Sequence, residues 1–107
     1  MSPTVTIHYE IMSIKGAEHC GDRHKNIRAG KPLILVPEPT NRYDPNAVRI
    51  RAEIFGKVTD LGYIPKNASA RIVGLIAGGT NILAVYIGQE FGPRMMLISE
   101  AELTPAV

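Results

Sequence analysis

One helical segment among many short strand-like segments is the feature that most limits how this chain can fold. Only residues 67–77 place apolar side chains at helical spacing, between Pro65 and a stop at Gly78-Gly79. We predict a helix there, with Asn67 as its N-cap. The other apolar segments alternate with polar residues or form short runs bounded by Gly and Pro, which is typical of strands. We predict strands at 4–14, 33–36, 48–53, 58–64, 82–87 and 94–99.

The order of these segments predicts a mainly β fold. Strands follow one another at hairpin spacing, for example across a turn at Phe55-Gly56-Lys57. The sequence lacks the strand–helix–strand alternation that is typical of a parallel sheet. We therefore expect a small OB-like antiparallel β-barrel of about six strands with one inserted helix. In the first strand, Val5, Ile7, Tyr9 and Ile11 share one side, which is the period of a half-buried strand. Gly62 is expected to mark a bulge or a close approach.

The length of 107 residues allows one compact domain, which we expect over residues 1–107 with a core at roughly 4–99. The last residues, 101–107, are expected to fray. No apolar run is long enough to span a membrane, and the first ten residues lack the apolar block of a signal peptide. The single cysteine, Cys20, excludes an internal disulfide and fits a reducing compartment, so we expect a cytoplasmic protein.

Charge gives only a weak indication of function. The formal net charge is +2, which is too small to identify a nucleic-acid-binding protein. The distribution is uneven, because residues 15–71 carry eleven Lys or Arg and six Asp or Glu. This local basic excess is compatible with a nucleic-acid partner, but on this observation alone an ordinary solvated surface with uneven charge is the better explanation.

Candidate chemical sites are few. His19, Cys20, Asp22 and His24 crowd one loop, but a structural zinc site usually needs a second pair of ligands, and none follows. Cys20 and His24 lack a recognisable third group for nucleophilic catalysis. The glycines at 74, 78 and 79 lie within and after the helix, so they do not form a phosphate-binding loop. We expect no metal, no cofactor and no catalytic activity.

The proline-rich segment 37–46 is the exception. It presents an amide, a guanidinium, a phenol ring and a carboxylate in succession, at Asn41, Arg42, Tyr43 and Asp44. An exposed ring beside a basic strand can stack on an unpaired base. A carboxylate repels phosphate but accepts hydrogen bonds from sugar hydroxyls. The plainer alternative, favoured by the residues alone, is that Tyr43 packs under the loop while Asn41 and Asp44 close Asx turns.

Two motifs in order resemble those of a known family. The run LILVPEPTNRYDPNAV, residues 33–48, resembles the core motif of the HIRAN family. Leu61-Gly62-Tyr63-Ile64-Pro65, followed by a helix that ends at glycine, is similar to the family's second motif, and Gly30 also fits. The resemblance covers roughly residues 10–80.

The resemblance implies an OB-like barrel that binds single-stranded DNA at a free 3′ end, as in fork-remodelling translocases. By motif position, Tyr43 would stack near the terminal base and Asp44 would accept the 3′-hydroxyl, with Asn41 as a supporting contact. Tyr63 and Lys66 would meet backbone phosphates. A role in DNA repair beside a helicase, a nuclease or another DNA-processing protein follows as an expectation.

The first loop departs from the family pattern. The DNA-gripping members carry a basic–aromatic pair soon after a glycine there. If that glycine is Gly16, the pair is Glu18-His19; if the loop is shifted, Arg23-His24 takes its place, and Arg23 is then a candidate DNA contact. The alternative function is a protein-interaction or regulatory module on the same barrel without DNA binding. It is favoured if Glu18 and Asp22 line the groove beside Tyr43.

Overall fold

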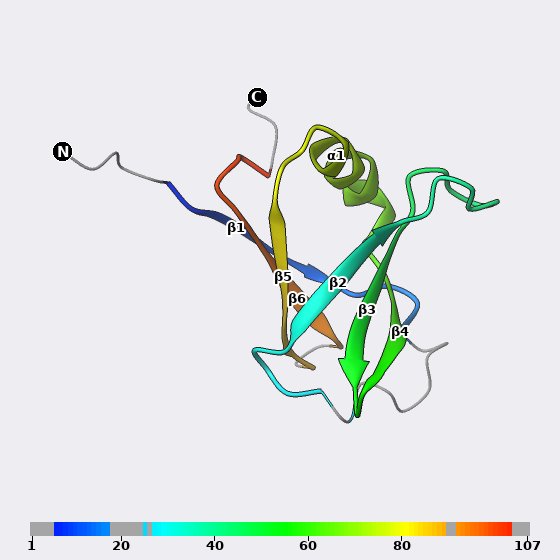
Figure 1. The fold of residues 1–107 in the computed structure, drawn as a ribbon, viewed down its shortest axis with the longest axis vertical. Coiled ribbons are helices and arrows are strands. Elements are labelled where there is room, and N and C mark those ends of the chain that lie inside the picture. Colours follow the sequence, from blue (N-terminus) through cyan, green and yellow to red (C-terminus); the bar gives the residue numbers. More distant parts are fainter. Residues whose placement is uncertain (1–5, 18–24, 26, 90–91, 104–107) are drawn as a thin grey trace.

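The computed structural model describes residues 6–17, 25, 27–89 and 92–103 (Figure 1). Within these residues there are six strands and one helix, as the sequence predicts. Their bounds are β1 His8–Ser13, β2 Pro32–Pro37, β3 Val48–Ile54, β4 Lys57–Tyr63, α1 Lys66–Ala77, β5 Ile82–Gly88 and β6 Arg94–Ser99. The helix lies across one end of the sheet, next to the loop between β2 and β3, while the turn between β3 and β4 lies at the other end.

The six strands form one antiparallel sheet in the order β1-β6-β5-β2-β3-β4. The mainly β prediction is therefore confirmed. A closed barrel is not confirmed, because the sheet is open and β1 and β4 are its two edges. These edges approach each other just beyond β1, where Lys15 forms an isolated antiparallel bridge with Tyr63.

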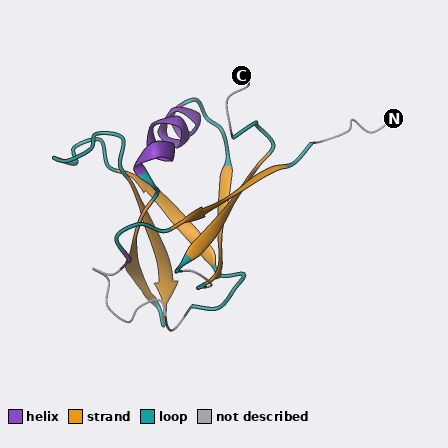
Figure 2. Cartoon of the chain, turned by 180° about the vertical axis from the view of Figure 1, so that it is seen from behind, coloured by secondary structure: helices purple, strands orange, loops and turns teal. Residues whose placement is uncertain are grey.

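The sheet is curved, as Figure 2 shows from behind. One hydrophobic core fills its concave side. Every strand contributes to this core, β3 through its alternate residues Val48, Ile50 and Ala52, and α1 adds Ala68 and Ile72. The residues with no exposed surface include Val48, Ile50, Ala52, Leu61, Ile72, Tyr86, Met95 and Leu97. The predicted helical stripe is confirmed, since Leu75 and Ile76 also pack against the core.

The start of α1 differs from the prediction. The N-cap is Pro65, and no side chain caps the first turn, so the predicted cap at Asn67 is wrong. Pro65 fixes its own φ and positions the following residue to begin the helix one residue earlier, which places Asn67 inside the first turn. In the described part of the chain, no helix has both the length and the apolar character needed to cross a bilayer.

A first strand is confirmed at His8–Ser13, which is shorter than the predicted 4–14. Its two sides are the reverse of what its pattern of alternation predicts. Ile7, Tyr9 and Ile11 point outward and are 56%, 69% and 48% exposed. The inward side carries Met12 and, just past the strand, Ile14, which are both in the core. Glu10 can face the same way because Arg71 of α1 neutralises it, at 2.6 and 3.0 Å.

Gly62 confirms both parts of its prediction. A bulge lies beside it, since Ile50 pairs with Gly62 but Arg51 pairs with Asp60. The backbone of residues 14 and 15 passes so close that a Cβ at position 62 would overlap the Lys15 carbonyl oxygen and lie 2.8 Å from Cγ2 of Ile14. The φ of Gly62 is +138°, a conformation that side-chain-bearing residues rarely adopt.

Candidate functional site

Five of the six predicted site residues line one hollow of about 600 Å³, where the loop between β2 and β3 meets the start of α1. The loop brings Asn41, Tyr43 and Asp44, the end of β4 brings Tyr63, and the first residue of α1 is Lys66. Lys15, Ala47 and Ile64 complete the lining. The two motifs, distant in the sequence, therefore meet at one place.

The loop holds its shape through its own hydrogen bonds. The Asn41 side-chain oxygen accepts bonds from the backbone N–H groups of Tyr43 and Asp44, at 2.9 and 3.1 Å. Asp44 Oδ1 accepts the N–H of Asn46 at 2.9 Å. Backbone bonds from Asn41 to Glu38 and from Ala47 to Asp44 close the remaining turns. The Asx-turn interpretation is thus confirmed for Asn41 and Asp44.

Tyr43 does not pack under the loop. Its side chain is 85% exposed at the rim of the hollow, which contradicts the plainer alternative for this residue. The guanidinium of Arg42 lies over the ring, 5.9 Å from its centroid. A phenol ring on a hydrogen-bonded loop loses little conformational freedom when a flat group stacks on it. The ring is therefore available to a ligand that presents a π face.

Asp44 is only partly engaged by the protein. Its Oδ1 takes the Asn46 amide, whereas Oδ2 lies 3.4 Å from the hydroxyl of Ser69. That hydroxyl is also 3.2 Å from the carbonyl oxygen of Lys66, within the first turn of α1. A 3.4 Å contact is long for an O–H···O hydrogen bond. Oδ2 consequently keeps acceptor capacity beside the hollow.

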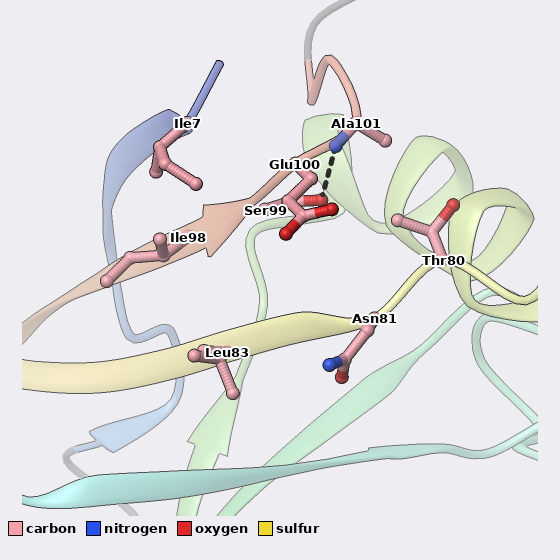
Figure 3. Close-up of a pocket in the computed structure, with 8 residues that line it drawn as sticks. All are labelled: Ile7, Thr80, Asn81, Leu83, Ile98, Ser99, Glu100 and Ala101. Atoms are coloured by element: carbon pink, nitrogen blue, oxygen red, sulfur yellow. Dashed lines mark hydrogen bonds between the residues drawn. The ribbon is translucent and has the colours of Figure 1, made fainter. Parts of the chain in front are cut away.

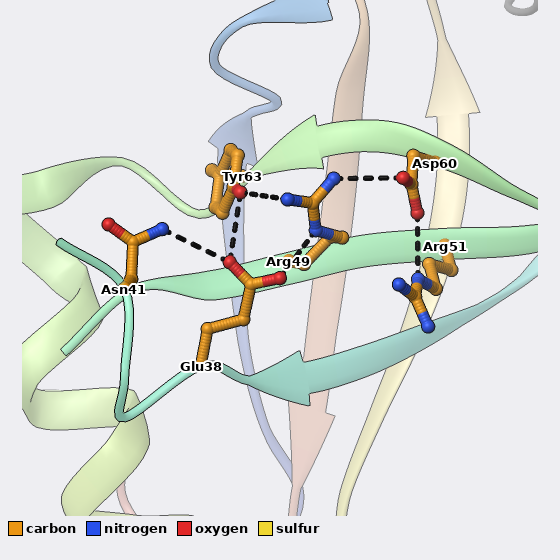
Figure 4. A network of polar contacts seen from close by, with 6 residues as sticks. All are labelled: Glu38, Asn41, Arg49, Arg51, Asp60 and Tyr63. Atoms are coloured by element: carbon orange, nitrogen blue, oxygen red, sulfur yellow. Dashed lines mark hydrogen bonds and ion pairs between the residues drawn. The ribbon is translucent and has the colours of Figure 1, made fainter. Parts of the chain in front are cut away.

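A polar network joins β3 and β4 to the loop after β2, and it shares Asn41 and Tyr63 with the lining of the hollow (Figure 4). Glu38 accepts hydrogen bonds from Asn41 at 3.1 Å, from the Tyr63 hydroxyl at 2.9 Å and from Arg49 at 2.6 Å. Arg49 also donates to the Tyr63 hydroxyl, and its guanidinium lies 4.8 Å from the centre of that ring. Asp60 bridges Arg49 and Arg51 at 2.8 and 2.7 Å. Glu38 thereby fixes both the loop and Tyr63.

The network also sets the ionisation of its members. The hydrogen bond from Arg49 holds the pKa of Glu38 below its ordinary value, against the opposing effect of burial. Burial, and then the bond to Glu38, raises the pKa of Tyr63. Glu38 is therefore ionised and Tyr63 protonated at neutral pH, so the Tyr63 hydroxyl acts as a donor to Glu38.

Two cations flank the hollow. Lys66 was identified from the sequence, and Lys15 was not, because its place beside Tyr63 depends on a backbone bridge between residues 48 positions apart. Both side chains are exposed, and neither has an ion-pair partner within the described part of the chain. The sequence signal that could have found Lys15 is Gly62, whose close approach is to the Lys15 backbone.

Several predictions fall outside the described residues. These include the candidate contact Arg23, the acidic pair Glu18 and Asp22, and the loop histidines His19 and His24 with Cys20. Among the residues that are described, no three His, Cys, Asp or Glu side chains gather in a group that could hold a metal ion. The described hollow instead combines rings, one partly free carboxylate and two ammonium groups.

A family model described as the HIRAN domain matches residues 5–91. No curated protein matches the chain.

Two solved structures share the fold. A crystal structure of a protein from Lactobacillus plantarum superposes with a TM-score of 0.66 at 18% identity, covering 88% of this chain and 97% of that one. The crystal structure of the HIRAN domain of human HLTF superposes with a TM-score of 0.61 at 15% identity, covering 87% of this chain and 75% of that one.

Proposed function

Since this chain belongs to the HIRAN domain family, we propose that it is a non-catalytic nucleic-acid-binding module that recognises single-stranded DNA at a free 3′-hydroxyl end. The observation that carries the proposal is the pairing of an 85%-exposed Tyr43 ring with the partly free carboxylate of Asp44 in one hollow. A ring can stack on any base, whereas a carboxylate selects a ligand group that is not a phosphate.

Asp44 gives the selectivity for a chain end. Within a DNA strand every 3′ oxygen is esterified, so only the terminal nucleotide offers a hydroxyl that can donate to a carboxylate. Oδ2 of Asp44, whose contact with Ser69 is 3.4 Å, is the acceptor. A terminal phosphate would bring negative charge against Asp44 and is rejected.

The surrounding residues complete the proposed site. Lys66 and Lys15 contact backbone phosphates on either side of the terminal nucleotide, and Tyr43 stacks on its base. Tyr63 forms the wall that Glu38 and Arg49 hold in position, and Asn41 contributes by shaping the loop. Arg23 remains a predicted contact from the first loop. The affinity for DNA from so few contacts is modest. A partner or tethered helicase, nuclease or other DNA-processing protein therefore carries out the reaction on the bound DNA.

Fluorescence anisotropy with matched oligonucleotides tests the proposal. Strands that end in a 3′-hydroxyl should bind more tightly than identical strands that end in a 3′-phosphate. Asp44→Asn should remove this preference, since the amide no longer repels phosphate. Glu53→Ala is the matched control, because Glu53 is an exposed carboxylate on β3 that does not line the hollow. It should keep the preference.

Two results would overturn the proposal. Equal affinity for the two ends in the unmodified protein would remove end recognition while leaving general DNA binding. Absence of binding at low salt, where phosphate contacts are strongest, would remove DNA binding altogether and favour the alternative of a protein-interaction module on the same fold.

A further inference from the structure

The outward side of β1, β6 and β5 is apolar across all three strands, and the proposed DNA-binding function does not use it. Cross-strand pairing aligns Tyr9 with Ile98 and Leu83, and Ile11 with Met96 and Val85. Leu83 is 59% exposed, in addition to the exposed residues of β1. We call this surface the β1–β6–β5 face; it comprises Ile7, Tyr9, Ile11, Leu83, Val85, Met96 and Ile98.

The face is large for a chain of this size. Its four most exposed members present on the order of 100 Å² each, and the three partly buried ones bring the total to roughly 600 Å². The largest apolar patch on a typical monomer spans about 300–600 Å² and often serves an interaction. The face also contains no charged side chain, so one copy would not repel another.

Charges of opposite sign lie at the two ends of the face, both along the line of β6. Arg94 begins β6, on the same side as Met96 and Ile98. The residue is half-buried, and its Nε is buried without a hydrogen-bond partner in the part of the chain that the structure describes, so only the terminal nitrogens of the guanidinium are offered to a second copy. Glu100 follows the other end of β6 and lines a hollow of about 400 Å³ together with Ile7, Leu83 and Ile98 (Figure 3). The hollow is open to a side chain from outside.

We propose that the β1–β6–β5 face binds the same face of a second copy of this chain, with the two β6 strands antiparallel across a two-fold axis. Only this orientation sets Arg94 against the partner's Glu100 at both ends; parallel strands would set like charges together. Two faces of this size bury roughly 1,200 Å², which reaches the range of a stable interface. Sheets packed in this way lie about 10 Å apart.

Sedimentation equilibrium over a range of protein concentrations tests this dimer. The unmodified protein should associate, and Tyr9→Lys and Leu83→Lys should each raise the dimer dissociation constant by about tenfold or more, because a lysine cannot be buried without a partner. Val58→Lys is the control, since Val58 is 62% exposed on β4 and lies outside the face. Circular dichroism should report an unchanged fold for all three variants.

Charge reversal tests the orientation. Arg94→Glu alone should weaken the dimer, because it sets two carboxylates together at each end, and so should Glu100→Arg. The double variant Arg94→Glu with Glu100→Arg should restore association.

A protein that remains monomeric at its highest workable concentration, or a dimer that Tyr9→Lys leaves unchanged, would overturn the proposal. Failure of the double variant to recover would overturn the antiparallel arrangement. DNA binding is a separate readout, because Tyr9 and Leu83 do not line the Tyr43 hollow.

Discussion

Lys15 and Tyr63 are joined backbone to backbone, each N–H donating to the other's carbonyl oxygen at 2.8 Å. This pair links the two edges of an otherwise open sheet. It also sets the ammonium group of Lys15 and the ring of Tyr63 along the same hollow. The contact between the two sheet edges and the candidate site therefore depend on the same pair of hydrogen bonds.

Gly62→Ala should disrupt this pair. A Cβ at position 62 would overlap the Lys15 carbonyl oxygen, and the φ of +138° is unfavourable for alanine. We expect a loss of about 2 kcal/mol or more in the free energy of unfolding, measured by urea denaturation. Gly56→Ala is the control for positive φ alone, since a Cβ there would meet no atom within 4 Å. Equal losses in the two variants would show that the close approach to Lys15 contributes nothing.

Glu38→Gln should change how stability depends on pH. The pKa of Glu38 is lowered in the folded protein, so between that value and the ordinary value of 4.5 the unfolded chain binds more protons. Stability from this carboxylate is therefore present above about pH 4.5 and is lost as the pH falls through the lowered pKa.

Thermal unfolding of both proteins between neutral and acid pH measures this effect. At neutral pH, Glu38→Gln should be the less stable by about 1 kcal/mol, because Arg49 and Tyr63 lose an ionised acceptor. The two stabilities should converge as the pH falls below 4.5. A constant difference across the whole range would contradict the role given to the Arg49–Glu38 pair.

Local patterns in the sequence predict the elements of this fold well. Helical spacing located α1 to within one residue at its start, and the Gly and Pro positions located the turns between strands. The side of a strand that faces the core is not a local property. Alternation in β1 predicts that the face with Tyr9 is buried. The opposite face is the buried one, because Met12 and Ile14 on it pack in the core and Arg71, 61 residues further along the chain, stabilises Glu10 there.

The candidate site divides in the same way. Tyr43 and Asp44 are neighbours in a proline-rich loop, so their shared position follows from the sequence alone. Lys15 was not predicted, because Gly62 indicates a close approach at this point but only the folded backbone shows that Lys15 is the residue that approaches it, beside Tyr63. The exposure of Tyr43 likewise depends on Asn41 and Glu38 holding the loop in its observed shape.

Arg71→Ala should destabilise the attachment of α1 to β1. Arg71 donates to both oxygens of Glu10 and to the carbonyl oxygen of Leu103, at 2.6 Å in the last case. Its removal leaves a largely shielded carboxylate without its cation, and we expect a loss of about 2 kcal/mol in the free energy of unfolding. Arg71→Leu combined with Glu10→Leu should cost less than Arg71→Leu alone. If the double variant loses the sum of the two single losses, the pair is not coupled.

Lys15→Ala should reduce the salt dependence of DNA binding. If Lys15 and Lys66 each contact one phosphate of a single strand, the logarithm of the binding constant should fall against the logarithm of salt concentration with a slope of about −1.4. Each alanine variant should make that slope shallower by about 0.7, whatever the base sequence.

Anisotropy titrations at several salt concentrations measure these slopes. Lys57→Ala is the matched control, because Lys57 is an exposed lysine at the turn between β3 and β4, at the far end of the sheet from the hollow. Its slope should equal that of the unmodified protein. If the slope becomes equally shallow in all three variants, diffuse positive charge holds the DNA. A shallower slope in Lys15→Ala and Lys66→Ala alone locates the phosphates beside Tyr43.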